Sequence, residues 1–433
     1  FSRNFIFKSS EITLKNLKKN EIFFYVILSA GFSLFLELSI IRIHSSYLHF
    51  FSFLKNISLI SCFLGLGIGY ALKNYKNYSL SWVFPLFTIE ILLLYILSQT
   101  PISTILINPI AEQFTMGQDT ARGFFHLLII YFFLVVVFLF NALCFVPIGQ
   151  LISKLMSKTE PLTAYGLNLI GSFFGIALFV FLSFLQTSPV IWINVSFIFF
   201  LIILRKNYGN IFISTFCVLI ISIFLTYDFK EKKQTIYSPY QNISIDFIGS
   251  PVNPVIVQVS HLFFQAVVNL SEKLNYERDM PADTRIYGPS MAVEHEREFY
   301  NLPFLMLEKL PKKILIVGSG TGNDVAAANR FNIQKIDAVE IDPVIANIGK
   351  KYHTEHPYQN NNVNLIIDDA RAYIQNSNNA YDAIIYGLLD SQTNLSSKGG
   401  IRLDSYVYTI EAFKEAKNKL NDDGFIYISF FPN

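Results

Sequence analysis

A glycine-rich segment at residues 318–324, GSGTGND, is where the sequence first suggests chemistry. It follows an apolar run, ILIVG at 314–318, and opens into the helix-forming stretch VAAANRF. Glycines let a ligand approach the backbone with no Cβ in the way, and the N-terminus of a helix supplies free N–H donors. We therefore predict a ligand-binding turn, with a purely structural tight turn as the alternative. The predicted contact residues are Gly318, Ser319, Gly320, Thr321, Gly322 and Asn323.

Acidic residues end or follow the next two apolar runs. Glu340 lies in DAVEID at 337–342, about 20 positions beyond the glycines, where a carboxylate can accept from both hydroxyls of a ribose. Asp369 and Ala370 follow VNLII at 363–367 and are suited to an adenine amino group. Each acid alone could be a solvated strand end. Together with the glycine turn they predict a nucleoside site for S-adenosylmethionine or a close relative.

Five apolar runs predict the strands that position these residues. They alternate with helical segments, which is typical of an open parallel sheet in a Rossmann-like α/β domain. Ligands of such sheets bind beyond the carboxyl ends of the strands, where the glycines and the acids fall. A polar loop that contains Asp390 follows the fourth run. The predicted strands are 314–318, 337–342, 363–367, 381–387 and 424–430.

The first half of the chain has the composition of a membrane protein. The 433 residues are 52% hydrophobic and include 43 Phe, too apolar for an ordinary soluble protein. Residues 1–226 carry 14 Lys and Arg against 7 Asp and Glu. These basic residues are scattered between apolar runs, which favours cytoplasmic loops over a nucleic-acid surface. Seven runs approach the roughly 20 residues that a membrane-spanning helix needs. They are 22–41, 51–72, 82–98, 124–149, 161–185, 188–204 and 210–226.

Small and polar residues inside these runs suggest how the helices pack. Gly171 and Gly175 form a GxxxG step, which predicts close approach of two helix backbones. Glu37 and Glu90 are costly at membrane depth, so we expect structural pairing, such as Glu37 with Arg42. A proton or substrate path is the alternative. The three cysteines fall within apolar runs and offer neither a disulfide framework nor metal-ligand spacing, so no metal is expected. They are Cys62, Cys144 and Cys217.

After residue 226 the long apolar runs give way to short apolar runs separated by polar turns. This change sets the predicted domain boundaries. We predict a basic segment at 1–20, a transmembrane helical region at 21–226, a small β-rich lead-in at 235–310 and the Rossmann-like domain at 311–433. The chain opens without Met and stops directly after a strand-like run. We therefore expect both ends to be cut and the last domain to be incomplete.

Two sets of observations disagree on the orientation of the membrane region. Alternate basic loops place the N-terminus in the cytoplasm, and seven crossings would then export the last domain. S-adenosylmethionine is a cytoplasmic metabolite, and three lysines follow the last run, which favours the cytoplasm for that domain. We expect that 82–98 or 188–204 is not a full span, or that 101–110 re-enters the membrane.

The motifs of the last domain resemble those of the integral-membrane spermidine synthase-like proteins, relatives of the soluble aminopropyltransferases on the methyltransferase fold. The resemblance lies in VGSGTGND, VEIDP, DDARAYI and YGLLDSQT with RLDSYVYTIEAF, and SPYQNI at 238–243 is similar to the start of the small β-domain of spermidine synthases. It implies nucleoside binding by the glycine turn, Glu340, and Asp369 with Ala370. Two positions depart from the family pattern: Thr321 and Gly387 stand where aspartates usually hold the donor's ammonium and take the acceptor's proton.

These observations lead to one functional expectation and one alternative. We expect a membrane-bound transferase that binds S-adenosylmethionine or decarboxylated S-adenosylmethionine and transfers an aminopropyl or methyl group to an unknown acceptor, such as an amine. In that case the resemblance implies Asp390 as the catalytic residue, the base or the group that orients the acceptor, with Asp324, Asp404 and Tyr408 as further contributors. The alternative is a nucleoside-sensing or transport-coupled membrane protein without turnover. The expected partners are the lipid bilayer and the small-molecule acceptor, without nucleic acid, and a homo-oligomer is left open. We expect an integral protein of the bacterial inner membrane with its soluble domain in the cytoplasm.

Overall fold

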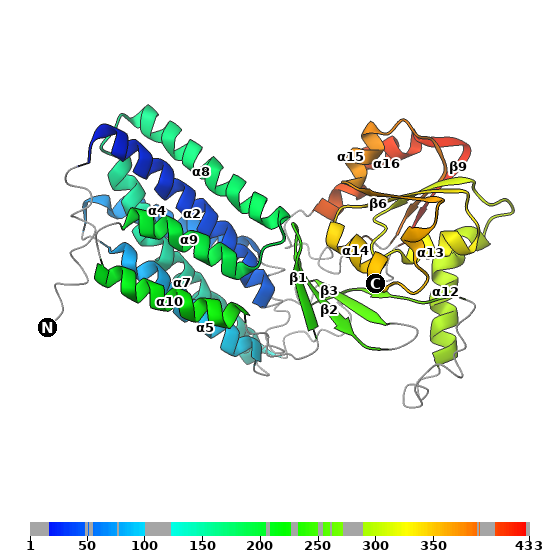
Figure 1. The fold of residues 1–433 in the computed structure, drawn as a ribbon, viewed down its shortest axis with the longest axis horizontal. Helices are drawn as coiled ribbons and strands as arrows, with labels where there is room; N and C mark the ends of the chain where they lie inside the picture. The colour runs from blue at the N-terminus through cyan, green and yellow to red at the C-terminus, as the bar shows by residue number, and fades with distance from the viewer. Residues whose placement is uncertain are drawn as a thin grey trace. The chain divides into compact units, whose positions relative to one another are not determined.

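The computed structural model describes residues 17–47, 51, 55–75, 78–99, 123–204, 208–226, 233–249, 254–259, 262–271, 289–387, 389 and 403–429. The chain divides into two compact units, Phe1–Glu231 and Lys232–Asn433 (Figure 1). The described part of the first unit is helical, whereas the second combines two β-sheets with helices.

Each of the seven predicted apolar runs of the first unit overlaps a helix. The helices are α2 (Lys19–Tyr47), α4 (Lys55–Ala71), α5 (Val83–Gln99), α7 (Phe124–Met156), α8 (Pro161–Phe184), α9 (Pro189–Ile203) and α10 (Tyr208–Thr226). By length and composition, α2, α4, α7 and α8 suffice to cross a membrane, and α5, α9 and α10 are shorter. The 15 residues of α9 rise about 22 Å, less than the roughly 30 Å of a hydrocarbon core. The predicted re-entrant stretch 101–110 lies outside the described residues.

Glycines allow two helix pairs to pack with their backbones in contact. A Cβ added to Gly171 or Gly175 of α8 would meet the carbonyl oxygen of Ile27 or Gly31 in α2. The predicted close approach at the GxxxG step is therefore present in the structure. Glycines of α4 have the same role, since a Cβ on Gly65 would meet the backbone of α7.

Ionisable side chains within the helical unit are buried and partly paired. His44 Nε2 lies 3.2 Å from Glu90 Oε1, and His44 Nδ1 lies 2.8 Å from the Ser58 hydroxyl. The predicted partner of Glu37, Arg42, instead donates to Ser183 Oγ at 2.8 Å. That prediction was wrong, because side chains five positions apart on a helix do not share a face.

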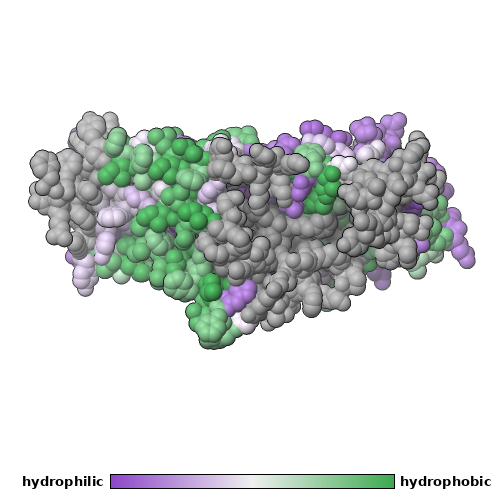
Figure 2. All heavy atoms as spheres, turned by 90° about the horizontal axis from the view of Figure 1, so that it is seen from below, coloured by the Kyte–Doolittle hydropathy of each residue, from purple (hydrophilic) through white to green (hydrophobic). Residues whose placement is uncertain are grey.

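Apolar side chains cover the outer surface of the helices. Figure 2 shows them gathered over the helical unit, and hydrophilic residues over the second unit. Large exposed side chains include Phe125, Leu162 and Phe212, which are 81%, 84% and 76% exposed. A surface of this kind suits contact with lipid better than contact with water.

A small antiparallel sheet begins the second unit. Its strands β1 (Lys233–Tyr237), β2 (Asn242–Phe247), β3 (Val255–Val259) and β4 (Leu262–Val267) lie in the order β1-β2-β3-β4. These strands lie at the start of the segment predicted as a β-rich lead-in, 235–310. Ile243 and Val257 of this sheet pack against Ile345 and Ile348 of α14 (Pro343–Tyr352), so the sheet shares a hydrophobic core with that helix.

The larger sheet has five parallel strands, as the sequence predicts. They are β5 (Lys313–Val317), β6 (Lys335–Glu340), β7 (Val363–Ile367), β8 (Tyr381–Tyr386) and β9 (Leu420–Ile428), in the order β7-β6-β5-β8-β9. The first three run outward from β5, and the chain then returns to place β8 on the other side of β5. The point at which strand order reverses therefore lies between β5 and β8.

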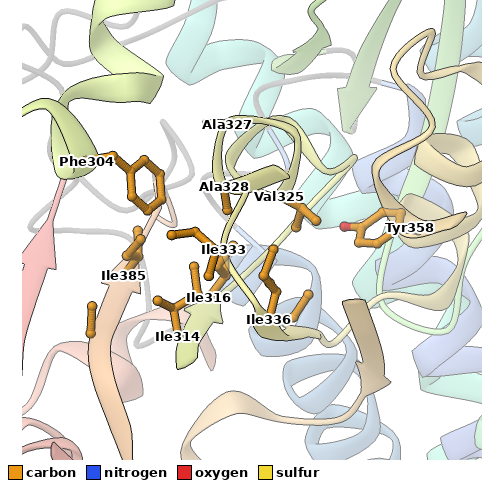
Figure 3. Close-up of a cluster of buried hydrophobic side chains, with 12 residues drawn as sticks. Phe304, Ile314, Ile316, Val325, Ala327, Ala328, Ile333, Ile336, Tyr358 and Ile385 are labelled. Carbon is orange, nitrogen blue, oxygen red and sulfur yellow. The ribbon is translucent and has the colours of Figure 1, made fainter. Parts of the chain in front are cut away.

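Helices cover both faces of this sheet. On one face, Ile314 and Ile316 of β5 pack with Phe304 of α12 (Pro289–Leu305) and Val325 of α13 (Asn323–Arg330), as Figure 3 shows. On the other, alternate residues of β5 pack against α15 (Ala370–Asn376) and α16 (Ile410–Lys417). Burial on both faces explains the continuous apolar runs of the sequence. The result is a three-layer Rossmann-like fold of the methyltransferase type.

Candidate active site

The carboxyl ends of β5, β6, β7 and β8 bring the predicted site residues to one edge of the sheet. The glycine turn follows β5, Glu340 ends β6, Asp369 follows β7 and Gly387 follows β8. In open α/β sheets ligands bind at this edge, beside the point where strand order reverses. The edge between β5 and β8 is therefore the candidate active site.

The turn after β5 requires its glycines. Gly318, Gly320 and Gly322 have φ values of 70°, 56° and 98°, in the left-handed region that side chains with a Cβ rarely adopt. Gly349 of α14 also lies against the carbonyl of Thr321, which leaves no room there for a Cβ. The turn is consequently fixed by its sequence and by the neighbouring helix.

Four N–H groups of the turn are hydrogen-bonded within the protein, whereas the predicted free donors are those of the helix that follows, α13. Ser319 N donates to Val339 O at 2.9 Å, and Gly320 N donates to Glu340 Oε2 at 2.8 Å. Thr321 N donates to Gln265 Oε1 at 3.0 Å, and Gly322 N donates to Ser319 O at 2.9 Å. We conclude that Gly320 and Gly322 permit close approach of a ligand, while their own N–H groups are used within the protein. In contrast, Thr321 Oγ1 is buried without a hydrogen-bond partner in the described part of the chain.

Glu340 stands at the strand end as predicted, but it is buried and supports the turn. Its Oε2 accepts from Gly320 N, its Oε1 accepts from Asp342 N at 2.9 Å, and its side chain is 7% exposed. Burial is the largest influence on this carboxyl group and raises its pKa to about 7. Each carboxylate oxygen has a second lone pair, so hydrogen bonds to a ribose remain available. From the sequence we expected Glu340 to stand at a strand end and outside the core, and its burial shows that the second part of this expectation was wrong.

Asp369 caps a helix in addition to its predicted ligand role. Its Oδ1 accepts from Ala372 N at 2.9 Å at the start of α15, and the residue is only half-buried. Ala370 is the first residue of that helix and is also half-buried. The structure thus keeps both residues at the accessible edge of the sheet, where their predicted contact with adenine remains to be tested.

The small sheet contributes to the site through residues that the sequence analysis did not single out. Gln265 of β4 accepts from Thr321 N, and a Cβ on Gly320 would collide with its side chain. Asn323 anchors the same contact, because its Nδ2 donates to Ala266 O at 2.9 Å and its Oδ1 accepts from Val268 N at 3.2 Å. Asn323 is therefore held by the protein and is 2% exposed, which leaves it little access to a ligand.

Tyr358 is a second residue that the sequence analysis missed. Its hydroxyl lies 2.8 Å from Gly320 O and 2.9 Å from Ser319 Oγ, in the interior behind the turn. Burial raises the pKa of this phenol well above its usual range. The only signal in the sequence was a Tyr after a Pro in a loop, which does not reveal a contact 38 residues away along the chain.

Asp324 lies beside Gly387, at the reversal point between β5 and β8. A Cβ built on Gly387 would lie 2.8 Å from Asp324 Oδ2 and 3.8 Å from Gly318 O. The side chain is half-buried, and burial raises the pKa of its carboxyl group to about 6. Leu389 packs over Gly318 from the same loop.

The predicted catalytic residue, Asp390, lies outside the described residues. Asp404 falls in the 3-10 segment Leu403–Tyr408, whose first side chains are not described either. Tyr408 packs against Tyr386 and Phe413, with ring centroids 6.3 and 6.4 Å apart. Over the described ranges, no group of three or more His, Cys, Asp or Glu residues could hold a metal ion.

Comparison with known proteins assigns a family to this domain. Residues 296–429 match the family described as Spermine/spermidine synthase domain. The polyamine aminopropyltransferase of Thermoplasma volcanium is 26% identical over 198 residues, which cover 38% of this chain and 72% of the relative. Polyamine aminopropyltransferase 2 of Hyperthermus butylicus is 29% identical over 126 residues, covering 28% and 39%. The enzyme of Sulfolobus acidocaldarius is 29% identical over 168 residues, covering 37% and 52%. The chain thus spans less than two thirds of two of these three relatives.

Solved structures of the same family are more distant. The spermidine synthase from Thermotoga maritima is 20% identical with a TM-score of 0.31, covering 45% of this chain and 55% of its own. A spermidine synthase in complex with the transition state analogue AdoDATO is 20% identical with a TM-score of 0.30, covering 43% and 53%. The family match confirms the spermidine synthase part of the predicted resemblance, and residues 296–429 form a spermidine synthase-like domain. The helical unit lies outside the matched range.

Proposed function

We propose that this protein is a membrane-anchored transferase that moves the aminopropyl group of decarboxylated S-adenosylmethionine to a small amine. The observation that carries the proposal is the placement of Glu340 beside the glycine turn, within a domain that matches the spermine/spermidine synthase family. The relatives named polyamine aminopropyltransferase support this donor and an amine acceptor.

The residues at the sheet edge have chemistry suited to such a donor. Glu340 keeps acceptor capacity for ribose hydroxyls, and Asp369 has a second carboxylate oxygen for an adenine amino group. Thr321 is a neutral residue in the turn and has a buried hydroxyl without a partner among the described residues. A hydroxyl can accept from the ammonium of the donor, but more weakly than a carboxylate, since charge-assisted hydrogen bonds are roughly twice as strong as neutral ones. We therefore expect weaker donor binding than a carboxylate at this position would give.

We further propose that the helical unit crosses the membrane and that the transferase domain faces the cytoplasm. Four helices long and apolar enough to span a bilayer support the anchoring. The short α9, with 15 residues, supports the idea that the number of crossings is not seven. A cytoplasmic domain would have direct access to the proposed donor.

Incubation of the purified protein with each donor form tests the function. With decarboxylated S-adenosylmethionine and an amine, we expect methylthioadenosine, whereas a methyltransferase would produce adenosylhomocysteine from S-adenosylmethionine. Calorimetric titration in parallel measures binding of both donors. Tight binding without any product over a panel of amines would instead support a sensing or transport-coupled protein and would refute the proposed transfer.

A further inference from the structure

We infer that Asp324 is the group that accepts the proton of the amine, and that Gly387 provides the space in which its carboxylate meets that amine. This inference rests on the proposed function, because it assigns a role within the aminopropyl transfer.

The position of Asp324 is the first argument. The residue lies in the first turn of α13, directly beyond the glycine turn, and its Oδ2 lies where a side chain at position 387 would begin, 2.8 Å from an ideal Cβ. Gly387 is the residue that follows β8, so the carboxylate lies over the reversal point between β5 and β8. A ligand at this edge would have Asp324 beside it.

The availability of the carboxylate is the second argument. Among the described residues no Lys, Arg or His forms an ion pair with Asp324, although ion pairs are found at Arg330 and Arg371 in the same unit. The residue as a whole is half-buried, so Asp324 is not enclosed within the core. A carboxylate that is partly desolvated and has no cation is suited to receive an ammonium group.

A purely structural role for Asp324 explains less. Acids in the first turn of a helix stabilise it through the helix dipole, and that interaction favours the charged form. Here burial is the larger influence and raises the pKa to about 6, so the charged form is disfavoured overall. A helix-stabilising acid also gives no reason for a glycine at position 387. A base with this pKa remains mostly deprotonated at neutral pH and holds a proton more firmly than an ordinary aspartate.

The chemistry of the step balances without another reactant. The protonated amine, R–NH3⁺, gives one proton to the Asp324 carboxylate and becomes R–NH2. Its nitrogen lone pair then forms a C–N bond to the aminopropyl carbon attached to sulfur. The C–S bond breaks, its electron pair stays on sulfur, and the sulfonium becomes the neutral thioether methylthioadenosine. The new secondary amine keeps its own proton as an ammonium, and Asp324 releases the transferred proton to water.

Two titratable side chains near this site must be considered with Asp324. The Tyr358 hydroxyl experiences the charges of both Asp324 and Glu340. Glu340 has a raised pKa of about 7, with burial as its main cause. Its titration would affect donor binding, so the pH dependence of donor affinity must be separated from that of turnover.

A set of variants of the full-length protein tests the inference with decarboxylated S-adenosylmethionine and putrescine, spermidine or 1,3-diaminopropane as acceptors. For the wild type we expect kcat to rise with pH through about 6 and then level. For Asp324→Asn we expect kcat to fall about a hundredfold, which is the low end of what a general base contributes. We also expect the rise of kcat with pH to disappear in this variant. The dissociation constant of the donor should change less than threefold. Asp382→Asn, at the opposite edge of the sheet, is the control and should keep the wild-type profile.

A second experiment moves the carboxylate from position 324 to position 387. Gly387→Asp alone should reduce turnover, because its carboxylate would collide with that of Asp324. Asp324→Ala combined with Gly387→Asp places one carboxylate in the same space and should recover at least tenfold over Asp324→Ala.

The two arms separate failure of the inference from failure of the proposed function. Wild-type turnover with an unaltered pH profile in Asp324→Asn would overturn the role of Asp324 alone. If the wild type forms no methylthioadenosine with any amine, the proposed transfer is refuted and the role of Asp324 with it.

Discussion

The carboxylate of Glu340 and the backbone N–H of Gly320 are joined by a hydrogen bond of 2.8 Å that connects the end of β6 to the turn after β5. The same carboxylate accepts from Asp342 N on its other oxygen. Glu340 therefore serves the fold and the proposed ribose contact at once, so its replacement must be tested with both stability and affinity as readouts.

Glu340→Ala should weaken donor binding and also destabilise the domain. The loss of hydrogen bonds from a ribose to a charged group should cost about 3 kcal/mol, roughly a hundredfold in affinity. The loss of the two backbone contacts should add a destabilisation of about 1–3 kcal/mol. Calorimetric titration and denaturant unfolding measure the two effects.

Asp382→Asn is a matched control for Glu340→Ala, because Asp382 accepts from Lys312 N and Lys313 N at the far edge of β8. It should lose stability and keep donor affinity. Unchanged affinity in Glu340→Ala would remove the ribose assignment.

The strands and the glycine turn could be predicted from the sequence because their signals are local. Buried strands such as 314–318 appear as continuous apolar runs, and the following glycines mark a turn with positive φ. The contacts of Gln265 and Tyr358 with that turn could not be predicted, because they join residues far apart in the chain. The burial of Glu340 was missed for a related reason: one of its two donors, Gly320, lies 20 residues away along the chain, which the position of Glu340 in the sequence does not reveal.

His353 should make the stability of the second unit depend on acid pH. The imidazole is 0% exposed, and burial followed by the Arg330 charge lowers its pKa from 6.5 to about 3. Because the folded pKa lies below the unfolded one, the unfolded state binds more protons between these values, and stability falls as pH decreases below about 6.5. At pH 5 the loss from this group should be about 2 kcal/mol.

Hydrogen exchange of amides in β5 and β6, corrected for intrinsic rates, measures the effect of His353. The raised pKa values of Glu340 and Asp324 act in the opposite direction, because their native forms bind more protons. The informative quantity is therefore the difference between the wild type and His353→Gln. This difference should change by about 2 kcal/mol between pH 7.5 and 5. A constant difference over this range would contradict the prediction.

The contact between α2 and α8 should tolerate no side chain at two of the glycines of α8. Gly171→Ala and Gly175→Ala each direct a Cβ at a backbone carbonyl of α2, which a rotamer change cannot relieve. Each should cost about 1–3 kcal/mol, as overpacking generally does. Gly166→Ala in the same helix has open space around its Cβ and should be neutral or slightly stabilising. Thermal unfolding in detergent distinguishes them, and equal stability of all three variants would show that the helices do not pack as described.

Asp390→Asn should reduce transfer without weakening donor binding. The prediction derives from the position of Asp390 in the sequence, four residues beyond the end of β8. The pH profile expected for this variant differs from that expected for Asp324→Asn. If Asp390 orients the acceptor, the variant should raise KM for the amine and keep the rise in kcat near pH 6. The resemblance implies that the carboxylate contact to the donor's ammonium is missing at Thr321. Its loss should cost about 1.5–3 kcal/mol, so we expect poor activity with putrescine. Efficient spermidine formation by the wild type would contradict the expected poor activity with putrescine. Full activity of Asp390→Asn with every acceptor would contradict the role of Asp390.

The transferase domain should be protected from membrane-impermeant thiol reagents in intact cells. Asn361 is exposed in the turn before β7, so Asn361→Cys provides an accessible probe, whereas Ser238 is 0% exposed and would react poorly. The native Cys62, Cys144 and Cys217 are buried and should give little background. We expect labelling of Asn361→Cys only after the membrane is permeabilised, because the proposed donor is made in the cytoplasm. Labelling in intact cells would place the domain outside, and it would require either a donor exported from the cell or a different ligand for the site beside Glu340.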